Sequence, residues 1–176
     1  VVVAGGGTAG WMAAASIAKL LGKTLDVTLI ESDEIGTVGV GEATIPTLQT
    51  LHELLQIKEQ DFVAAVQGTF KLGISFENWR DKGDDYIHSF GYTGQDCWAA
   101  GFQHFWLKGK QLGLSEEFGN YCTELVAAQD NRFAVLPNNG LNYASHFDAS
   151  LYAKFLRGIA EENGAVRKEG KIRQVE

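Results

Sequence analysis

The sequence predicts an α/β fold that opens with a βαβ unit, and three features of the first 31 residues predict it. The run of β-branched residues Val1–Ala4 is typical of a buried strand. Ala, Leu and Ile fill the segment Trp11–Leu21, as in a packed helix, and Gly22 ends it. A second apolar run with an acidic end, Asp26–Glu31, predicts the next strand. A strand, a helix and a strand within about thirty residues form a βαβ unit.

The elements beyond residue 31 follow from the same kinds of pattern. Ser32–Pro46 contains several glycines and a proline, which predicts a loop or an extended strap. A helical and insert region, 47–165, follows, and its clearest helix is Ala149–Asn163, with Asp148 as N-cap and Gly164 just past the end. The other predicted helices are Thr47–Gln56, Glu59–Val66, Phe102–Leu112 and Glu116–Gln129. Strands are predicted at Phe70–Phe76 and Val166–Glu176, and irregular structure over Arg80–Ala100.

Composition and charge argue against several classes of function. The formal net charge of −7 argues against a nucleic-acid-binding protein, although backbone N–H groups can hold a pyrophosphate without basic side chains. The sequence has no run of roughly 18 uncharged apolar residues, so it predicts no membrane span. Cys97, Cys122 and the histidines show no metal-ligand spacing, so we expect no metal. The two thiols are expected to be buried or partly buried in a reducing cytoplasm.

Both ends of the chain fall within predicted strands, and Val1 already lies inside an apolar run. Domains rarely begin and end in the middle of a strand. We therefore expect residues 1–176 to be the N-terminal part of a single larger domain, truncated at both ends.

The segment between the first strand and the first helix matches the dinucleotide fingerprint, Gly5-x-Gly7-x-x-Gly10. The first glycine permits the tight turn, the second lets the pyrophosphate approach the backbone, and the third lets helix and strand pack closely. The N–H groups at the helix start, including those of Thr8 and Ala9, then face the phosphates, and the helix dipole adds to the attraction. We therefore expect this segment to bind a dinucleotide.

Glu31 ends the second strand, 21 positions after Gly10, where a carboxylate can accept hydrogen bonds from ribose hydroxyls. The plainer interpretation is a solvated charge at a strand end, the commoner fate of a glutamate. In this context the ribose role is favoured. An acidic partner disfavours the 2′-phosphate of NADP, and the residues alone leave FAD and NAD both open.

Two segments resemble the flavin-dependent tryptophan halogenase family: Gly5–Met12 (GGGTAGWM) and, more specifically, Gly39–Pro46 (GVGEATIP). Further matches occur in the family's order over nearly the whole chain: Phe70-Lys71, Phe76–Arg80 (FENWR), His88-x-Phe90, His104–Leu107 (HFWL) and His146–Ala149 (HFDA). The resemblance implies a Rossmann-like FAD-binding domain with inserted substrate-binding segments. The βαβ unit would be 1–31 and the flavin strap 32–46.

The resemblance also implies a reaction. In that family a separate flavin reductase supplies reduced FAD, oxygen and a halide then give hypohalous acid, and the acid passes through a tunnel to a lysine beside an aromatic substrate. The matching lysine is Lys71. Its ammonium would hydrogen-bond hypohalous acid, whereas a neutral amine would form a haloamine, so the pKa of the side chain decides between them. Without the resemblance, a surface lysine with its stem on an apolar face is the simpler interpretation.

Other site residues follow from the same resemblance. His88 and Phe90 match residues that line the aromatic substrate's pocket, and Phe90 could stack on an indole. The strap residues Gly41, Glu42, Ala43 and Thr44 match those that contact the flavin, and Thr44, Ile45 and Pro46 those that couple flavin and halide sites. For His88 and Phe90 the alternative is local packing, and for the strap it is a glycine-rich connector.

Two features of the family are absent: the Trp-x-Trp-x-Ile-Pro signature, and the Ser-Thr-Gly segment with the glutamate that assists the lysine. Both belong downstream of residue 176, so we expect the fragment alone to be inactive. The sequence leaves open tryptophan, indole or another electron-rich arene as substrate, chloride or bromide as halide, and the oligomeric state.

Three alternatives to a halogenase can be distinguished. A related flavin monooxygenase that hydroxylates or epoxidises shares the glycine loop and Glu31, yet needs neither Lys71 nor the strap motif. A non-catalytic FAD-binding protein would tolerate Lys71→Ala without effect. An NAD-dependent dehydrogenase would require an acid–base residue in a second domain, which the sequence does not indicate.

Overall fold

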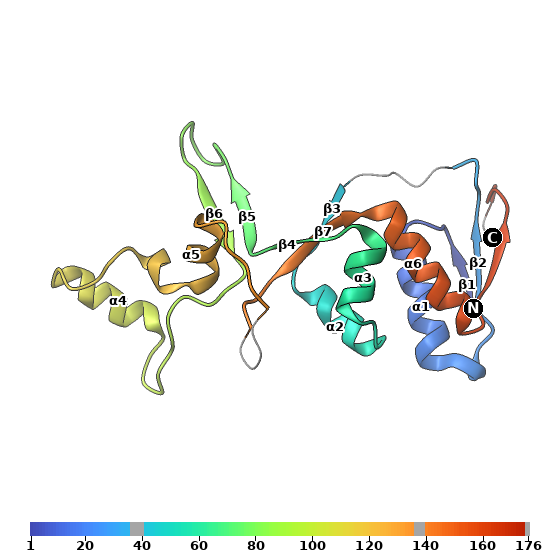
Figure 1. Cartoon of the computed structure of the whole chain (residues 1–176), viewed down its shortest axis with the longest axis horizontal. Helices are drawn as coiled ribbons and strands as arrows, with labels where there is room; N and C mark the ends of the chain where they lie inside the picture. The colour runs from blue at the N-terminus through green and yellow to red at the C-terminus, as the bar shows by residue number, and fades with distance from the viewer. Residues whose placement is uncertain (36–40, 136–139, 175–176) are drawn as a thin grey trace. The chain divides into compact units, whose positions relative to one another are not determined.

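The computed structural model describes residues 1–35, 41–135 and 140–174, and Figure 1 shows their elements. The chain forms two compact units: unit 1 comprises Val1–Thr69 and His146–Glu176, and unit 2 comprises Phe70–Ser145. Gly36, Gly39 and Val40 of the predicted strap lie outside the described residues.

Unit 1 contains a three-stranded parallel sheet in the order β1-β2-β8, formed by Val2–Ala4, Thr28–Glu31 and Val166–Glu169. The helix α1, Thr8–Leu21, crosses from β1 to β2, and a single 3₁₀ turn, Gly22–Thr24, follows it. This confirms the predicted βαβ unit. Its helix begins earlier than expected, at Thr8 instead of Trp11, because the last three residues of the glycine fingerprint are already helical.

The helix α6, Ala149–Glu162, lies beside α1, and the two pack against each other (Figure 1). Small side chains let the two helices approach closely, since alanines on both helices are fully or almost fully buried. The buried alanines that the two helices contribute to the core are Ala14, Ala15, Ala18, Ala149, Ala153 and Ala160. Asp148 is the N-cap of α6, as predicted, and its side chain accepts a hydrogen bond from the N–H of Leu151 at 2.9 Å.

A short strand of the strap, β3 (Gly41–Ala43), pairs antiparallel with β7 (Ala144–Asp148). The register places Glu42 opposite Phe147. The helices α2 (Thr47–Leu54) and α3 (Glu59–Val66) follow β3 and match the predicted segments closely. The strand β7 was not predicted from the sequence, because ASHFD contains only one large apolar residue and shows no clear alternation.

Three predictions for the elements of unit 2 are wrong in detail. The single strand expected over 70–76 is two strands, β4 (Thr69–Lys71) and β5 (Gly73–Phe76). Part of the stretch expected to be irregular forms β6 (Tyr86–Ser89), which pairs antiparallel with β5. The helix expected from residue 116 is a 3₁₀ turn, Phe118–Tyr121, followed by α5 (Thr123–Gln129). The helix α4 (Phe102–Gln111) agrees with its prediction.

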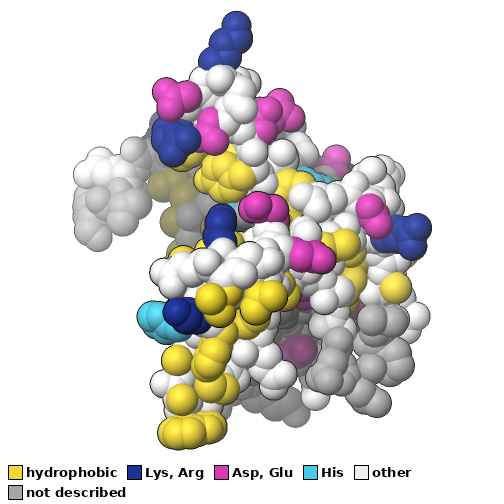
Figure 2. Space-filling view, turned by 90° about the vertical axis from the view of Figure 1, so that its left-hand side faces the viewer, with side chains coloured by type: hydrophobic (Ala, Val, Ile, Leu, Met, Phe, Trp, Pro, Cys, Tyr) yellow, Lys and Arg dark blue, Asp and Glu magenta, His cyan; other side chains and the backbone are white. Residues whose placement is uncertain are grey.

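Three further expectations fail. Val2 is exposed rather than buried in residues 1–176, because among the described strands β1 pairs with β2 on one side only. Cys97 is exposed and only Cys122 is buried. The last strand ends at Glu169 instead of continuing. Hydrophobic side chains are also exposed in and after α4, including Phe105, Leu107, Leu112 and Leu114. Figure 2 shows hydrophobic side chains gathered on the face that it presents.

An aromatic cluster in unit 1 surrounds a buried polar pair. The Nε2 of His52, on α2, lies 2.8 Å from the hydroxyl of Tyr152, on α6. The ring of Phe62 meets the ring of His52 edge-on, with 4.5 Å between the ring centroids. The ring centroids of Phe147 and Tyr152 are 4.9 Å apart. Burial lowers the pKa of His52 to about 4 and raises the pKa of Tyr152 above its ordinary range. Both side chains are therefore neutral near pH 7.

We predict that the free energy of unfolding falls as the pH drops from about 6.5 toward 4, because the unfolded state then protonates His52 and the folded state does not. A folded pKa of about 4 against the ordinary 6.5 corresponds to a loss of about 3 kcal/mol at the acid end. His52→Gln should flatten this decline. Denaturant unfolding of the full-length protein at pH 7 and at pH 4.5 measures it.

His104→Gln is the matched control, since His104 is exposed on α4 and should leave the decline as in the wild type. An equally steep decline in His52→Gln would show that other groups cause it.

Candidate functional site

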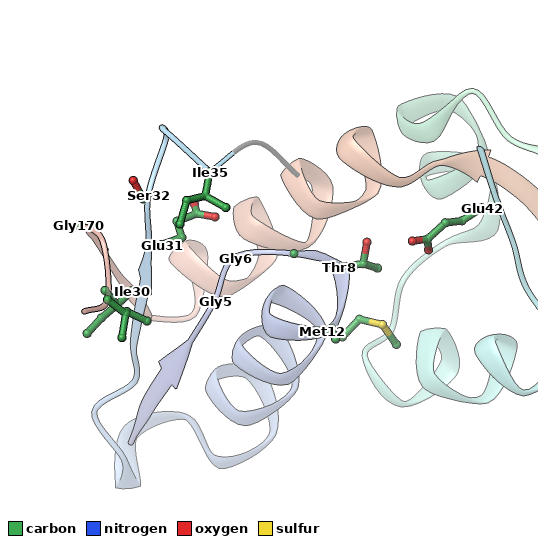
Figure 3. Close-up of a pocket in the computed structure, with 13 residues that line it drawn as sticks. Gly5, Gly6, Thr8, Met12, Ile30, Glu31, Ser32, Ile35, Glu42 and Gly170 are labelled. Atoms are coloured by element: carbon green, nitrogen blue, oxygen red, sulfur yellow. The ribbon is translucent and has the colours of Figure 1, made fainter. Parts of the chain in front are cut away.

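A cavity of about 670 Å³ opens at the carboxyl ends of β1 and β2. The glycine loop forms its floor, the end of β2 forms one wall, and Gly170 and Ile172, after β8, complete that side. Figure 3 shows Glu31 at one end of this cavity and Glu42 at the other, with the loop between them. Ligands of open α/β sheets bind at this position, outside the carboxyl ends of the strands.

Each glycine of the fingerprint lies in a distinct environment. Gly5 has φ +106°, which L-residues rarely adopt, and its N–H donates to the carbonyl of Ile30 at 2.9 Å. A Cβ at Gly10 would overlap the carbonyl oxygen of Gly5, so helix and strand are packed too closely for a side chain. A Cβ at Gly7 would meet nothing within 4 Å. Gly7 therefore borders open space that a ligand can approach.

The first turn of α1 faces the same cavity. Thr8, Ala9 and Met12 line it, and no side chain caps the helix at Gly7. The N–H groups at the start of a helix lack intrahelical partners and attract anions. The arrangement can therefore hold a diphosphate through backbone groups, as the fingerprint predicts.

Glu31 lies at the end of β2, with most of its side chain buried. Its carboxylate rests against Gly6, where a Cβ would overlap it. The Nε of Arg167, on β8, donates to Oε1 of Glu31 at 2.6 Å. A buried, ion-paired carboxylate at this point of the cavity is not the freely solvated charge of the alternative interpretation.

The strap residues line a second cavity of about 320 Å³. Ala43, Thr44 and Ile45 contribute to it, together with Phe147 and Tyr152. Thr8, Met12 and Glu42 line both cavities, so the two adjoin along the start of α1. The combined space leads from Glu31 to the strap residues, so it offers room for a ligand longer than the glycine loop alone would hold.

Unit 2 brings Lys71 and Phe90 together. Lys71 ends β4, is half-buried, and its Nζ lies 5.3 Å from the centroid of the Phe90 ring. Burial lowers the pKa of Lys71 from its ordinary value, whereas an aromatic face favours the ammonium form. His88, the other predicted substrate residue, is exposed on β6 opposite Ile74.

A buried carboxylate supports the segment that carries Phe90. Glu124, on α5, is 7% exposed and accepts a hydrogen bond from the N–H of Asn142 at 2.8 Å. Its other oxygen accepts a weak hydrogen bond from the buried thiol of Cys122 and lies where a Cβ on Gly91 would be. Sequence reasoning missed this glutamate, because its neighbours in the sequence give no sign that it is buried.

The sequence analysis also missed Gly170, Ile172 and Arg167. All three are positioned by the parallel pairing of β8 with β2. Glu31 and Arg167, which this pairing brings together, are 136 residues apart in the sequence. A strand after the last helix was predicted, and this was the available signal. Its register could not be read from the sequence.

In the described residues, no three His, Cys, Asp or Glu side chains gather as metal ligands would. No helix among them is both long and apolar enough to cross a membrane.

The βαβ unit, the glycine loop and the adjoining cavities define a dinucleotide-binding α/β protein. The family model for tryptophan halogenase matches residues 1–176, and the chain belongs to that family. Membership in this family implies FAD as the cofactor, and the cavity along the glycine loop is compatible with it.

Individual relatives and solved structures are similar to this chain and belong to the same class of enzyme. A tryptophan 7-halogenase from Lentzea aerocolonigenes is 38% identical over 188 residues, which cover 95% of this chain and 35% of the relative. The structure of a flavin-dependent halogenase from Xanthomonas campestris is 64% identical with a TM-score of 0.94, over 99% of this chain and 36% of that one. For a flavin-dependent halogenase from Brevundimonas sp. BAL3 the values are 39% and 0.86, with the same coverages. The chain thus spans about a third of the length of these relatives.

We predict opposite effects for two substitutions in the glycine loop. Gly10→Ala should destabilise the full-length protein by about 1–3 kcal/mol, because the methyl group overlaps backbone. Gly7→Ala should leave stability nearly unchanged, since φ −71° suits alanine and the space is open. It should weaken FAD binding by about tenfold or more, because the methyl group obstructs the approach of the pyrophosphate.

Thermal melting and flavin titration of both variants measure these effects, with Gly158→Ala, on α6, as the control. Unchanged FAD affinity in Gly7→Ala would contradict the assignment of the cavity.

Proposed function

We propose that the full-length protein is an FADH2- and oxygen-dependent halogenase that acts on an electron-rich aromatic compound, with Lys71 as the catalytic residue. The observation that carries the proposal is Lys71 itself. It is a half-buried lysine against an aromatic ring, in a chain that also contains the dinucleotide cavity and the strap. Family membership supports the same conclusion.

The dinucleotide cavity accounts for the cofactor. Gly5, Gly7 and Gly10, with the N–H groups of Thr8 and Ala9, would hold the pyrophosphate, and Glu31 would accept hydrogen bonds from the ribose. The open space beside Gly7 and the absence of a side-chain cap on α1 fit such a ligand. When bound in reduced form, the flavin supplies hypohalous acid from oxygen and halide.

The strap would hold the flavin ring. Gly41, Glu42, Ala43 and Thr44 would contact it through backbone groups, and Thr44, Ile45 and Pro46 would lie between the flavin and the halide. The two cavities adjoin at Thr8, Met12 and Glu42. This supports the assignment, because the second cavity offers space for the flavin ring beyond the proposed pyrophosphate site.

Lys71 would act on hypohalous acid beside the substrate. Its ammonium N–H donates a hydrogen bond to the oxygen of the acid, which makes the halogen more electrophilic. The ring carbon of the arene then bonds to the halogen, the O–X bond breaks, and the ring proton and the hydroxide leave as water. Phe90 would stack on the arene and favour the charged lysine, and His88 would border the pocket.

The partners follow from this chemistry. A flavin reductase would supply the reduced cofactor, and chloride or bromide would be the halide. Tryptophan and indole are the first substrates to test, because the family model and the relative from Lentzea aerocolonigenes are named for tryptophan.

We predict that Lys71→Ala lowers halogenation by at least about 100-fold while oxygen consumption continues, because the lysine acts after the flavin has reacted. The full-length protein is supplied with reduced FAD, oxygen and bromide, and brominated tryptophan and indole are measured by mass spectrometry beside oxygen uptake.

Lys82→Ala is the matched control, since Lys82 is an exposed lysine of the same unit. Undiminished bromination in Lys71→Ala would remove the catalytic role of Lys71. Hydroxylated product without halogen from the wild type would identify a monooxygenase instead.

A further inference from the structure

Arg167 links two acidic residues at the adenosine end of the proposed FAD site. Its Nε donates to Oε1 of Glu31 at 2.6 Å, and its terminal nitrogen pairs with Asp33. The side chain is only 15% exposed. The parallel register of β2 and β8 places Arg167 opposite Leu29, two residues before Glu31, so the side chain extends along the sheet toward the cavity.

The ion pair fixes one oxygen of Glu31 and leaves the other available. A carboxylate has about four acceptor positions, and Arg167 occupies one of those on Oε1. Oε2 lies over Gly6, whose missing side chain leaves room for it within the cavity wall. A carboxylate held in one rotamer can accept hydrogen bonds from a ribose without losing side-chain entropy on binding.

The ion pair of Arg167 also reduces the negative charge of the site. Three carboxylates lie at one end of the sheet, those of Glu31, Asp33 and Glu169. Glu169 also accepts a weak hydrogen bond from the N–H of Asp33. A pyrophosphate carries two negative charges, and carboxylates within a Debye length of about 8 Å repel it. A guanidinium shared by two of these carboxylates reduces that repulsion.

We propose that Arg167 is a positioning residue for FAD, which orients Glu31 toward the ribose and offsets the negative charge beside the pyrophosphate. The inference rests on the proposed function for the identity of the ligand. It assigns to Arg167 a role through Glu31 and through its own charge, with no direct contact to the flavin.

Two other roles are possible for such an arginine, and each has a different consequence. A purely structural link between β2 and β8 would stabilise the sheet and affect every ligand equally. An arginine that competes with the ribose for Glu31 would weaken FAD binding, and its removal would strengthen it.

The test measures the affinities of FAD, ADP and FMN for the full-length protein, with Arg167→Met and Arg167→Lys as variants. Arg167→Met should weaken FAD and ADP by about tenfold and leave FMN unchanged, because FMN lacks the adenosine half. Arg167→Lys keeps the charge without the fork of the guanidinium and should give an intermediate loss. In the Glu31→Ala background, Arg167→Met should weaken FAD binding less than it does in the wild type, because the orientation of Glu31 is then already lost and only the charge of Arg167 beside Asp33 is removed.

Arg80→Ala is the matched control, since Arg80 also pairs with two carboxylates, Asp81 and Asp84, but belongs to unit 2 and lines no part of the cavity. Unchanged or tighter FAD binding in Arg167→Met would overturn the proposal. So would an equal loss for FMN accompanied by a lower melting temperature, which would indicate a structural link.

Ligand binding by the wild type distinguishes a failure of the proposed flavin chemistry from a failure of the role proposed for Arg167. If it binds ADP but not FAD, the proposed flavin chemistry fails, and the ADP titrations still decide the role of Arg167. If it binds neither, both proposals fail.

Discussion

The packing of α1 against α6 is the constraint on which the candidate dinucleotide site depends. Buried alanines on both helices allow a close approach that larger side chains would prevent. The interface fixes α1, whose first turn faces the cavity, against a helix that begins immediately after β7. Because β7 pairs with β3, the same interface also determines where β3, near the end of the strap, lies. The glycine loop and β3 are thus held by connected contacts.

The aromatic cluster extends this support beneath the strap. Phe147 lies opposite Glu42 in the β3–β7 pair, and its ring packs on Tyr152 and Phe62. The His52–Tyr152 hydrogen bond satisfies the polar atoms that this apolar environment would otherwise leave unpaired. Tyr152 also lines the cavity of the strap, so a residue of the core forms part of the candidate site.

Local sequence patterns were sufficient for the parts of the fold that local contacts determine. The βαβ unit, α3 and the Asp148 cap all agree with prediction, because a strand, a turn, a helix and a cap are each specified within a few residues. The glycine loop was predicted for the same reason. The strand β7 could not be predicted, since its single large apolar residue becomes buried only when distant segments pair with it.

The candidate site divides in the same way. Lys71 and the strap were identified through resemblance, and no spacing rule would have singled them out. The contact between Lys71 and Phe90 joins residues on either side of a hairpin whose second strand was predicted to be irregular. Arg167 and Glu124 could not be identified from motifs. The partner of Arg167 lies 136 residues away in the sequence, and the sequence around Glu124 gives no local signal that it is buried.

The negative charge of the chain is compatible with the candidate site. A dinucleotide site that relies on arginine or lysine for its phosphates would call for basic residues around the glycine loop. Here the first turn of α1 presents its backbone N–H groups, and Arg167 is paired with Glu31 and Asp33 instead. Recognition of the phosphates by backbone groups does not depend on net charge, so a chain with a formal charge of −7 can still bind a pyrophosphate. In the proposed assignment, charged side chains would serve the ribose, where Glu31 would accept hydrogen bonds and Arg167 would orient it.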